Sequence, residues 1–303
     1  MRQIQTVGEV GLIERMRRRL HRGRSVVVGI GDDAAVLSGT GAQRWLLASD
    51  MLVEGVHFRR NLVSPDGIGW KALACNISDI AAMGGLPCWA VVSLGLPAET
   101  AVAFVDGLYR GLARCARRFG MSIVGGDTVL APCVVVNVAI VGAVNHRHVV
   151  LRSGARVGDL LFVTGRLGGS YRSGRHARFM PRLAEAQQLV RSTRVHAMMD
   201  LSDGLASDVW QIARASRMTL RIEAARIPIS PAAKTVEHAL MDGEDFELLF
   251  AVSPKDAERL PARLRDCPVT RIGRVVRRGA GVELESGHGH VAPVVPTGFQ
   301  HFS

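Results

Sequence analysis

Acidic residues of this chain gather beside serines, glycines and the ends of apolar runs, where proteins commonly hold metal ions or phosphates. The stretch Asp200-Leu201-Ser202-Asp203 follows the apolar run Val195–Met199 and precedes a helical pattern that starts at Leu205. This order predicts that Ser202 and Asp203 cap the helix. Because a helix N-terminus attracts anions, several carboxylates placed there indicate divalent cations between them and a bound phosphate. The alternative is a helix with more capping carboxylates than it needs.

Carboxylates also follow the apolar runs of the first half. Gly31-Asp32-Asp33 follows Val26–Ile30, and Ser49-Asp50 follows the strand-like run Trp45–Ala48. Asp79 lies within a helix that we expect to begin at Ser64-Pro65 and to end at Gly84-Gly85. An unpaired charge near the buried side of that helix is costly, so Asp79 needs a partner, and a cation would serve.

A glycine pair precedes a further aspartate at residues 125–128. Gly125-Gly126-Asp127-Thr128 follows a short strand expected at Met121–Val124. A turn there would let the backbone approach a phosphate closely while Asp127 holds its metal. Tight turns without a ligand share this composition.

Taken together, these residue types indicate phosphoryl transfer. The chemistry-bearing aspartates are Asp32, Asp33, Asp50, Asp79, Asp127, Asp200 and Asp203. Such hard oxygen ligands suit Mg²⁺ and not zinc. No serine or cysteine nucleophile is paired with a histidine, so the pattern favours positioning and charge neutralisation without a covalent step. The G-x-x-x-x-G-K-[ST] and dinucleotide glycine signatures are both missing, so an ATP site must be of another kind.

Length and composition predict a globular protein of two domains. The chain has 303 residues, 48% of them hydrophobic, which is enough for sizeable cores. We place the domain boundary near residue 150, giving domains 1–150 and 151–303. The apolar run Val134–Val144 is too short to cross a bilayer, so we expect no membrane partner and a cytoplasmic location. The five cysteines show no paired spacing and are expected to be reduced.

The net charge of +11 comes almost entirely from arginine. Only Lys71, Lys234 and Lys255 are lysines among 38 basic residues. Aromatic residues make up 5% of the chain and do not alternate with the arginines as a stacking surface for bases requires. We therefore expect no nucleic-acid partner, although an arginine-driven nucleic-acid binder without catalysis stays an alternative.

Helical and strand-like patterns alternate along the whole chain. In the first half, Gly8–Leu20 is expected to be a helix with Val10, Ile13, Met16 and Leu20 on one face. Trp89–Leu96, Ala98–Phe119 and Val134–Val144 are expected to be strand, helix and strand. In the second half, strands are expected at Leu160–Thr164, Met218–Ile222, Phe246–Val252 and Val269–Val276, and helices at Pro181–Val190, Pro231–Leu240 and Pro254–Leu264. The acidic turn Asp242-Gly243-Glu244-Asp245 comes directly before one of these strands.

The motifs, in order, resemble the thiamine-monophosphate kinase family. The matching residues are Gly29-Ile-Gly-Asp-Asp-Ala34, Ser49-Asp50, His57-Phe58, the run from Lys71 through Asp79 to Gly84, Gly125-Gly-Asp-Thr128, Arg152-Ser-Gly154, Asp200-Leu-Ser-Asp-Gly204 and Gly243-Glu-Asp-Phe-Glu-Leu248. The resemblance implies an α+β fold of two domains shared with aminoimidazole ribonucleotide synthetase, selenophosphate synthetase and the hydrogenase maturation factor. It also implies a homodimer formed through N-terminal strands, and ATP- and Mg²⁺-dependent phosphorylation of thiamine monophosphate to thiamine diphosphate.

The resemblance also implies roles for individual residues. Mg²⁺ ions would be held by Asp33, Ser49, Asp50, Asp79, Asp127, Asp200 and Asp203, and ATP would contact Gly126, Asp127, Arg152 and Ser202. His57 and Glu244 would face thiamine monophosphate, His57 toward its phosphate and Glu244 toward the thiamine end. A phosphate oxygen of the substrate would attack the γ-phosphorus of ATP in line, and no general base is needed because that phosphate is already ionised.

Three departures from the family pattern concern the substrate more than the reaction. Ala48 stands where a hydroxyl is usual, and the segment Gly165–Ala184 is short and arginine-rich. Pro296-Thr297-Gly298-Phe299 stands where a tryptophan commonly packs on the thiamine ring, so Phe299 is the candidate replacement. The alternative function is a paralogous ATP-dependent enzyme of the same superfamily that acts on a different small molecule.

Overall fold

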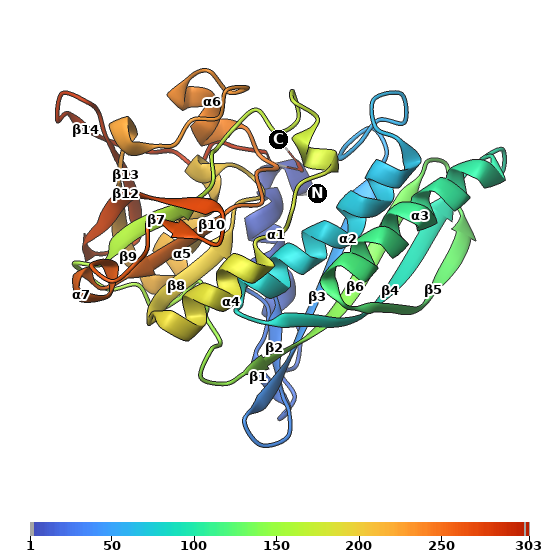
Figure 1. The fold of residues 1–303 in the computed structure, drawn as a ribbon, viewed down its shortest axis with the longest axis horizontal. Helices are drawn as coiled ribbons and strands as arrows, with labels where there is room; N and C mark the ends of the chain where they lie inside the picture. Colours follow the sequence, from blue (N-terminus) through green and yellow to red (C-terminus); the bar gives the residue numbers. More distant parts are fainter. Residues whose placement is uncertain (1–2, 300, 303) are drawn as a thin grey trace.

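The N-terminal half is a mixed sheet covered on one face by helices. The computed structural model describes residues 3–299 and 301–302. The sheet has the order β1-β2-β3-β6-β4-β5, in which β4 and β5 run parallel and the other pairs antiparallel. Its strands are β1 (Val26–Val28), β2 (Ala35–Ser38), β3 (Gln43–Val53), β4 (Leu86–Leu96), β5 (Ser122–Leu130) and β6 (Val135–Asn145). Helices α2 (Pro65–Ala82) and α3 (Val102–Phe119) cover one face, while η1 (Ile4–Thr6) and α1 (Gly8–Arg17) precede the sheet (Figure 1).

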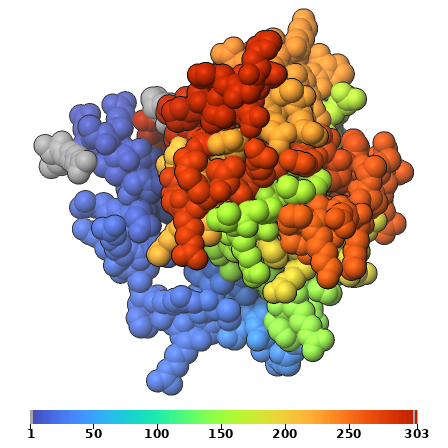
Figure 2. All heavy atoms as spheres, turned by 90° about the vertical axis from the view of Figure 1, so that its left-hand side faces the viewer, coloured from blue at the N-terminus to red at the C-terminus, as the bar shows by residue number. Residues whose placement is uncertain are grey.

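The C-terminal half is built on a second mixed sheet, with the order β14-β13-β9-β12-β7-β10-β8 and β11 paired to β12. Its strands are β7 (Leu160–Thr164), β8 (Val195–Asp200), β9 (Met218–Glu223), β10 (Leu248–Val252), β11 (Arg263–Leu264), β12 (Cys267–Arg278), β13 (Gly281–Glu285) and β14 (Val291–Pro293). The helical elements are η2 (Arg175–Ala177), α4 (Leu183–Ser192), α5 (Leu205–Ser216), η3 (Ala224–Arg226), α6 (Val236–Met241) and α7 (Pro254–Ala257). Figure 2 shows the orange and red C-terminal residues over most of this face of the molecule, with blue N-terminal residues beside them.

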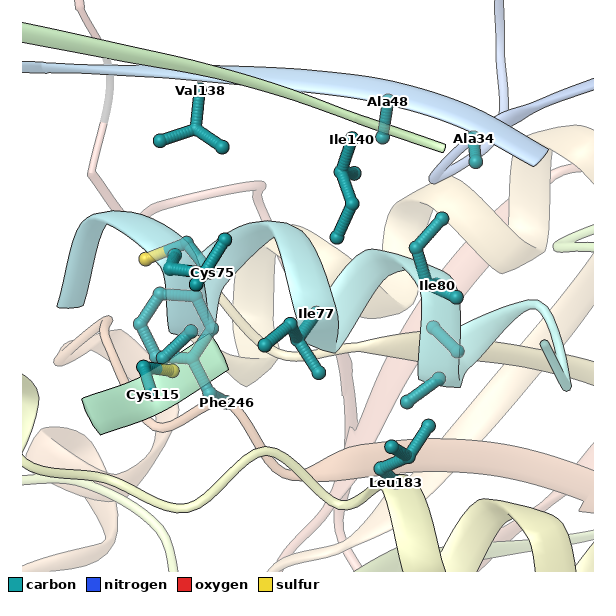
Figure 3. Packing of buried hydrophobic residues seen from close by; sticks show 14 of the residues in the cluster. Ala34, Ala48, Cys75, Ile77, Ile80, Cys115, Val138, Ile140, Leu183 and Phe246 are labelled. Atoms are coloured by element: carbon teal, nitrogen blue, oxygen red, sulfur yellow. The ribbon is translucent and has the colours of Figure 1, made fainter. Parts of the chain in front are cut away.

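Helix α2 joins the two halves. The Ser64 hydroxyl accepts a hydrogen bond from the Gly67 N–H and Pro65 occupies the first turn, so the sequence sets its start as expected. Ile77 and Ile80 lie fully buried on α2, between Ile140 of the first sheet and Leu183 and Phe246 of the second half (Figure 3). Because one apolar cluster includes both halves, the polar residues of α2 are fixed at the junction between them.

The architecture confirms the expected α+β class, but several local predictions are wrong. Val10, Ile13 and Met16 of α1 are exposed, and this helix has no buried residue. The helices expected at Pro231–Leu240 and Pro254–Leu264 are confined to α6 and α7. The second helix is shorter than expected because Pro261 interrupts the segment and Leu264 at its end pairs with Cys267 in the β11–β12 hairpin.

The boundary expected near residue 150 falls between the two sheets, after β6 and before β7. It stays a prediction, because the shared apolar cluster means that the halves are not separated by an open linker. Among the described residues, no helix is long and apolar enough to cross a membrane.

Candidate active site

A large cavity lies where the two halves meet. Its volume is about 1090 Å³, which is the size of a site for a nucleotide or another sizeable small molecule. Its lining includes Ser49, Asp50, His57, Lys71, Asp79, Asp200, Ser202, Asp203, Glu244 and Phe299. Residues predicted from separate motifs are therefore brought together, by β3 and α2 on one side and by β8, the start of α5 and the α6–β10 loop on the other.

Three of the predicted metal ligands converge at one point. Asp33 comes from the loop before β2, Asp79 from α2 and Asp200 from the end of β8, and one carboxylate oxygen of each lies within 4.8 Å of the others. The Ser78 hydroxyl donates to Asp200 Oδ2 at 2.5 Å. Asp33 Oδ2 is buried and has no hydrogen-bond partner among the described residues. A buried, unpartnered carboxylate oxygen in such a group fits a divalent cation.

Burial and mutual repulsion raise the pKa values of these carboxyl groups. Burial, with the charge of Asp33, raises the pKa of Asp200 to about 8 and that of Asp50 to about 6. Burial also raises the pKa of Asp79 well above its ordinary value, and the charges of Asp50 and Asp200 add to that rise. A cation that compensates the charge would lower these pKa values again.

Arg152 supplies a positive charge at the edge of this cluster. Its Nε donates to Asp33 Oδ1 at 3.0 Å, and its second guanidinium nitrogen also contacts that oxygen. Its backbone N–H donates to the Asp32 carboxylate at 3.1 Å. The residue predicted to contact ATP is thus anchored by two aspartates, and Asp32, one of the candidate aspartates, holds its backbone.

The predicted capping by Ser202 and Asp203 is wrong. The N-cap of α5 is Gly204, with φ of 103°, and no side chain caps the helix. Asp208 instead reaches back from the first turn, and its Oδ2 accepts a hydrogen bond from the Asp203 N–H at 3.0 Å. Because they do not cap the helix, Ser202 and Asp203 remain available to the cavity that they line.

Ser49 and Asp50 differ in direction because successive residues of a strand face opposite sides. Ser49 is exposed on the outer face of β3, where its hydroxyl accepts a hydrogen bond from Asn137 Nδ2 at 3.3 Å. Ala48, where the family usually has a hydroxyl, is 8% exposed and belongs to the core that packs on α2. Asp50 is the residue of this motif whose pKa is raised by burial and by the charges of Asp33 and Asp203.

Gly126 and Asp127 lie apart from the other predicted residues. They belong to β5, so the turn expected at Gly125–Thr128 is wrong. A Cβ at Gly126 would lie 1.7 Å from the Val92 carbonyl oxygen, so glycine is required there for β5 to pair with β4. Asp127 is exposed, and its Oδ1 accepts from the Thr128 N–H at 2.8 Å. Figure 1 shows β5 at the edge of its sheet, away from the C-terminal half.

Aromatic rings and a buried ion pair also line the cavity. The rings of His57 and Phe299 are 6.2 Å apart, and His301 lies 4.8 Å from Phe299. The Val53 N–H donates to His57 Nδ1 at 3.0 Å, and burial lowers the pKa of His57 to about 4. His57 is therefore neutral, with its proton on Nε2.

Lys71 belongs to one of the motifs, but no role could be assigned to it from the sequence. Its ammonium nitrogen lies 2.5 Å from Glu244 Oε2. Lysine is rare in this chain, but only the structure shows that Lys71 is buried and which residues it meets. Tyr171, Arg172 and His301 also line the cavity, and no pattern in the sequence marked them.

The arginine-rich segment Gly165–Ala184 is folded against the C-terminal half by a buried carboxylate. Arg182 Nε and a terminal guanidinium nitrogen each donate to Glu247 at 2.6 Å, and Thr164 Oγ1 donates to the same group at 2.7 Å. Arg175 also contacts Glu247. The arginines of this segment therefore serve its folding, which brings Tyr171 and Arg172 to the cavity wall.

Comparison with known proteins agrees with this arrangement. The models of AIR synthase related protein match residues 31–144 for the N-terminal domain and 156–284 for the C-terminal domain. Thiamine-monophosphate kinase of Rhodopirellula baltica is 40% identical over 311 residues, covering 97% of each chain. The chain belongs to the thiamine-monophosphate kinase family. The enzyme of that name from Bacillus subtilis is 36% identical and is aligned over 88% of this chain and 91% of its own.

Solved structures show the same fold. The structure described as AaThiL complexed with AMPPCP and TMP has a TM-score of 0.88 and 32% identity, and covers 99% of each chain. Thiamine monophosphate kinase from Aquifex aeolicus has a TM-score of 0.78 at 32% identity, covering 91% of this chain and 96% of its own. The hydrogenase maturation protein HypE in complex with ATP has a TM-score of 0.72 at 21% identity over 89% of each chain, which supports the fold alone.

Proposed function

We propose that this protein transfers the γ-phosphate of ATP to thiamine monophosphate, giving thiamine diphosphate and ADP. The observation that carries the proposal is the convergence of Asp33, Asp79 and Asp200 beside a cavity that His57, Glu244 and Phe299 also line. The acidic cluster suits the phosphates through their cations, and aromatic rings beside a carboxylate suit a cationic heterocycle with an amino group. Membership of the kinase family supports the same reaction.

Mg²⁺ is the cation that fits the acidic cluster. Asp33, Asp50, Asp79, Asp200 and Asp203 offer only carboxylate oxygens, the donors that Mg²⁺ prefers. When bound there, Mg²⁺ would offset the charge of the phosphates and of the transition state. Ser49 and Asp127 are the less supported ligands in a single chain. Ser49 lines the cavity, but its hydroxyl is hydrogen-bonded to Asn137, and Asp127 lies outside the cavity lining.

The side chains of the protein would position the two substrates. Arg152, held by Asp33, would place its charge beside the ATP phosphates, and Ser202 would contact ATP from the loop before α5. His57 would donate from Nε2 to the substrate phosphate, while Phe299 and His301 would pack on its ring system. The attacking phosphate oxygen is already ionised at neutral pH, so these residues need only align it with the γ-phosphorus.

We also propose that the protein is a homodimer that buries the outer face of the N-terminal sheet. This face exposes a group of large apolar side chains, namely Leu47, Met51, Trp89, Val91 and Val129, with Val129 54% exposed. Contiguous apolar surface of this kind is unusual on a monomer. A partner placed there would contact β5 and could bring Asp127 of one subunit to the acidic cluster of the other.

The cytoplasmic location expected from the sequence remains part of the proposal, and the five free cysteines fit a reducing compartment.

The experiment that tests the reaction is incubation of the purified protein with ATP, Mg²⁺ and thiamine monophosphate, followed by mass detection of products. We expect thiamine diphosphate and ADP in equal amounts. Unphosphorylated thiamine in place of thiamine monophosphate is the matched control, and it should yield no diphosphate. ATP turnover that requires a different acceptor would instead indicate a paralogous enzyme.

A further inference from the structure

Lys71 is buried at the base of the cavity and connects residues from both halves of the molecule. Its side chain is 1% exposed, and its ammonium donates to the His57 carbonyl oxygen at 2.7 Å. The same nitrogen lies 2.5 Å from Glu244 Oε2. Lys71 comes from α2, His57 from the loop after β3 and Glu244 from the loop after α6. One ammonium therefore joins the two segments that carry the proposed substrate contacts.

The residue type at this position is informative because the chain strongly favours arginine. Lys71 is one of three lysines among 38 basic residues, and Lys234 and Lys255 are exposed. A guanidinium presents five donors in a planar fork, whereas an ammonium is a compact point charge. A carbonyl oxygen and a carboxylate oxygen around one buried nitrogen suit the ammonium. We conclude that the buried geometry, and not composition, determines the lysine.

Glu244 is held in an uncommon backbone conformation that its neighbours must stabilise. Its φ is 67°, in the left-handed region that side-chain-bearing residues seldom adopt. The Ser202 carbonyl accepts a hydrogen bond from the Glu244 N–H at 2.6 Å, which fixes the backbone. The ion pair with Lys71 fixes the side chain and uses Oε2, so Oε1 is left for a ligand. The side chain of Glu244 is 24% exposed, as access for a ligand requires.

We propose that Lys71 is a positioning residue for substrate recognition, which holds the Glu244 carboxylate ready to accept a hydrogen bond from the amino group of the substrate heterocycle. This inference rests on the proposed function. Lys71 acts through Glu244, and the His57 carbonyl holds its ammonium in place. Lys71 and Glu244 line the cavity and Arg152 does not, so we expect the loss of the pair to affect the acceptor substrate more than ATP.

The test is a double-mutant cycle on the full-length protein with Lys71→Met, Glu244→Gln and the double variant. Steady-state KM for thiamine monophosphate, KM for ATP, kcat and melting temperature are measured for each. Lys255→Met is the matched control, since it removes an exposed lysine outside the cavity. We expect each single variant to raise KM for thiamine monophosphate about 10-fold or more, with KM for ATP changed less than about twofold. The double variant should be no worse than the worse single variant.

Three results would overturn the inference. The first is a KM for thiamine monophosphate that differs by less than about twofold between Lys71→Met and an active wild-type protein. Another is a parallel rise of both KM values with a fall in melting temperature, which indicates a purely structural role. The third is a double variant whose effect equals the product of the single effects.

The design separates this inference from the proposed function. An inactive wild type removes the proposed function and the inference together, whereas an active wild type with an unchanged Lys71→Met removes the inference alone. If Lys71→Met fails to fold, the double variant, which buries neither charge, is compared with Glu244→Gln. Equal KM values for thiamine monophosphate support the inference, and a further rise above about twofold contradicts it.

Discussion

At the scale of single residues, the site is defined by carboxylates that the fold forces together. Asp33, Asp79 and Asp200 could be predicted from the sequence because each follows an apolar run or interrupts a helical stripe, where a carboxylate has no structural reason to be. Lys71 and Arg172 could not be assigned in this way. Their roles depend on which distant segment meets them, and spacing along one chain does not contain that information.

Replacing a carboxylate of the cluster should remove catalysis without unfolding the protein. We expect Asp79→Asn and Asp203→Asn each to lower kcat by at least about 1000-fold, because phosphate charge would no longer be compensated. Melting temperatures without metal should be unchanged or higher, since one source of repulsion is removed. Asp106→Asn, on the exposed side of α3, is the control that should retain full activity. Ordinary activity in both cluster variants would contradict the assignment.

The same repulsion predicts how stability depends on pH. The pKa values of Asp50, Asp203 and Asp200 in the folded protein are raised to about 6, about 6 and about 8. The unfolded chain therefore loses these protons at lower pH than the folded protein does, and stability falls as pH rises from about 4 to about 8. Without metal, the melting temperature should fall by about 5 °C or more over that range. Mg²⁺ should reverse most of the loss at pH 8. A melting temperature that rises with pH over this range in the absence of metal would contradict repulsion among these carboxyl groups.

At the scale of elements, α2 was predictable and β5 was not. Ser64-Pro65 and the glycines after Met83 bound α2 by local chemistry alone, and its long apolar stripe identifies it as buried. In β5, the sequence Gly125-Gly126-Asp127 has turn composition, yet it is a strand because β4 pairs with it. The partner strand overrides a weak local preference. Likewise, α1 has a helical apolar pattern but no surface within one chain on which to bury it.

The two glycines of β5 offer a matched test of this element. Alanine at Gly126 would place a Cβ 1.7 Å from the Val92 carbonyl oxygen, whereas at Gly125 the nearest atom is Val91 Cγ1 at 3.8 Å. We expect Gly126→Ala to lower the melting temperature by several degrees, and Gly125→Ala to change it by less than about 1 °C. Equal melting temperatures for the two variants would mean that β5 does not pair with β4 as described.

At the scale of the whole molecule, the cleft between two packed halves provides the site, and the open sheet face provides a second surface. The fold class followed from the alternation of helical and strand patterns together with the family resemblance, and the comparisons confirm it. The pairing order β3-β6-β4 is not readable from sequence, because it depends on contacts between segments far apart in the chain.

Subunit mixing tests whether Asp127 acts across a dimer. Asp127→Asn and Asp79→Asn are each expected to be inactive as purified homodimers. A mixed dimer has one site in which both aspartates are intact only if Asp127 reaches the site of the partner subunit. Refolding the two variants together in equal amounts should then restore about a quarter of wild-type activity. No recovery, with mixed dimers present by mass, would place Asp127 in its own chain's site or outside it.

The most direct measurement of the central claim uses ATP labelled with ¹⁸O at the γ-phosphate. Incubation with Mg²⁺, thiamine monophosphate and the protein should place the label in the terminal phosphate of thiamine diphosphate, in step with ADP formation. Asp200→Asn should show neither product, because it removes one carboxylate of the cluster. Label released as inorganic phosphate, with no thiamine diphosphate formed, would contradict transfer in this cleft.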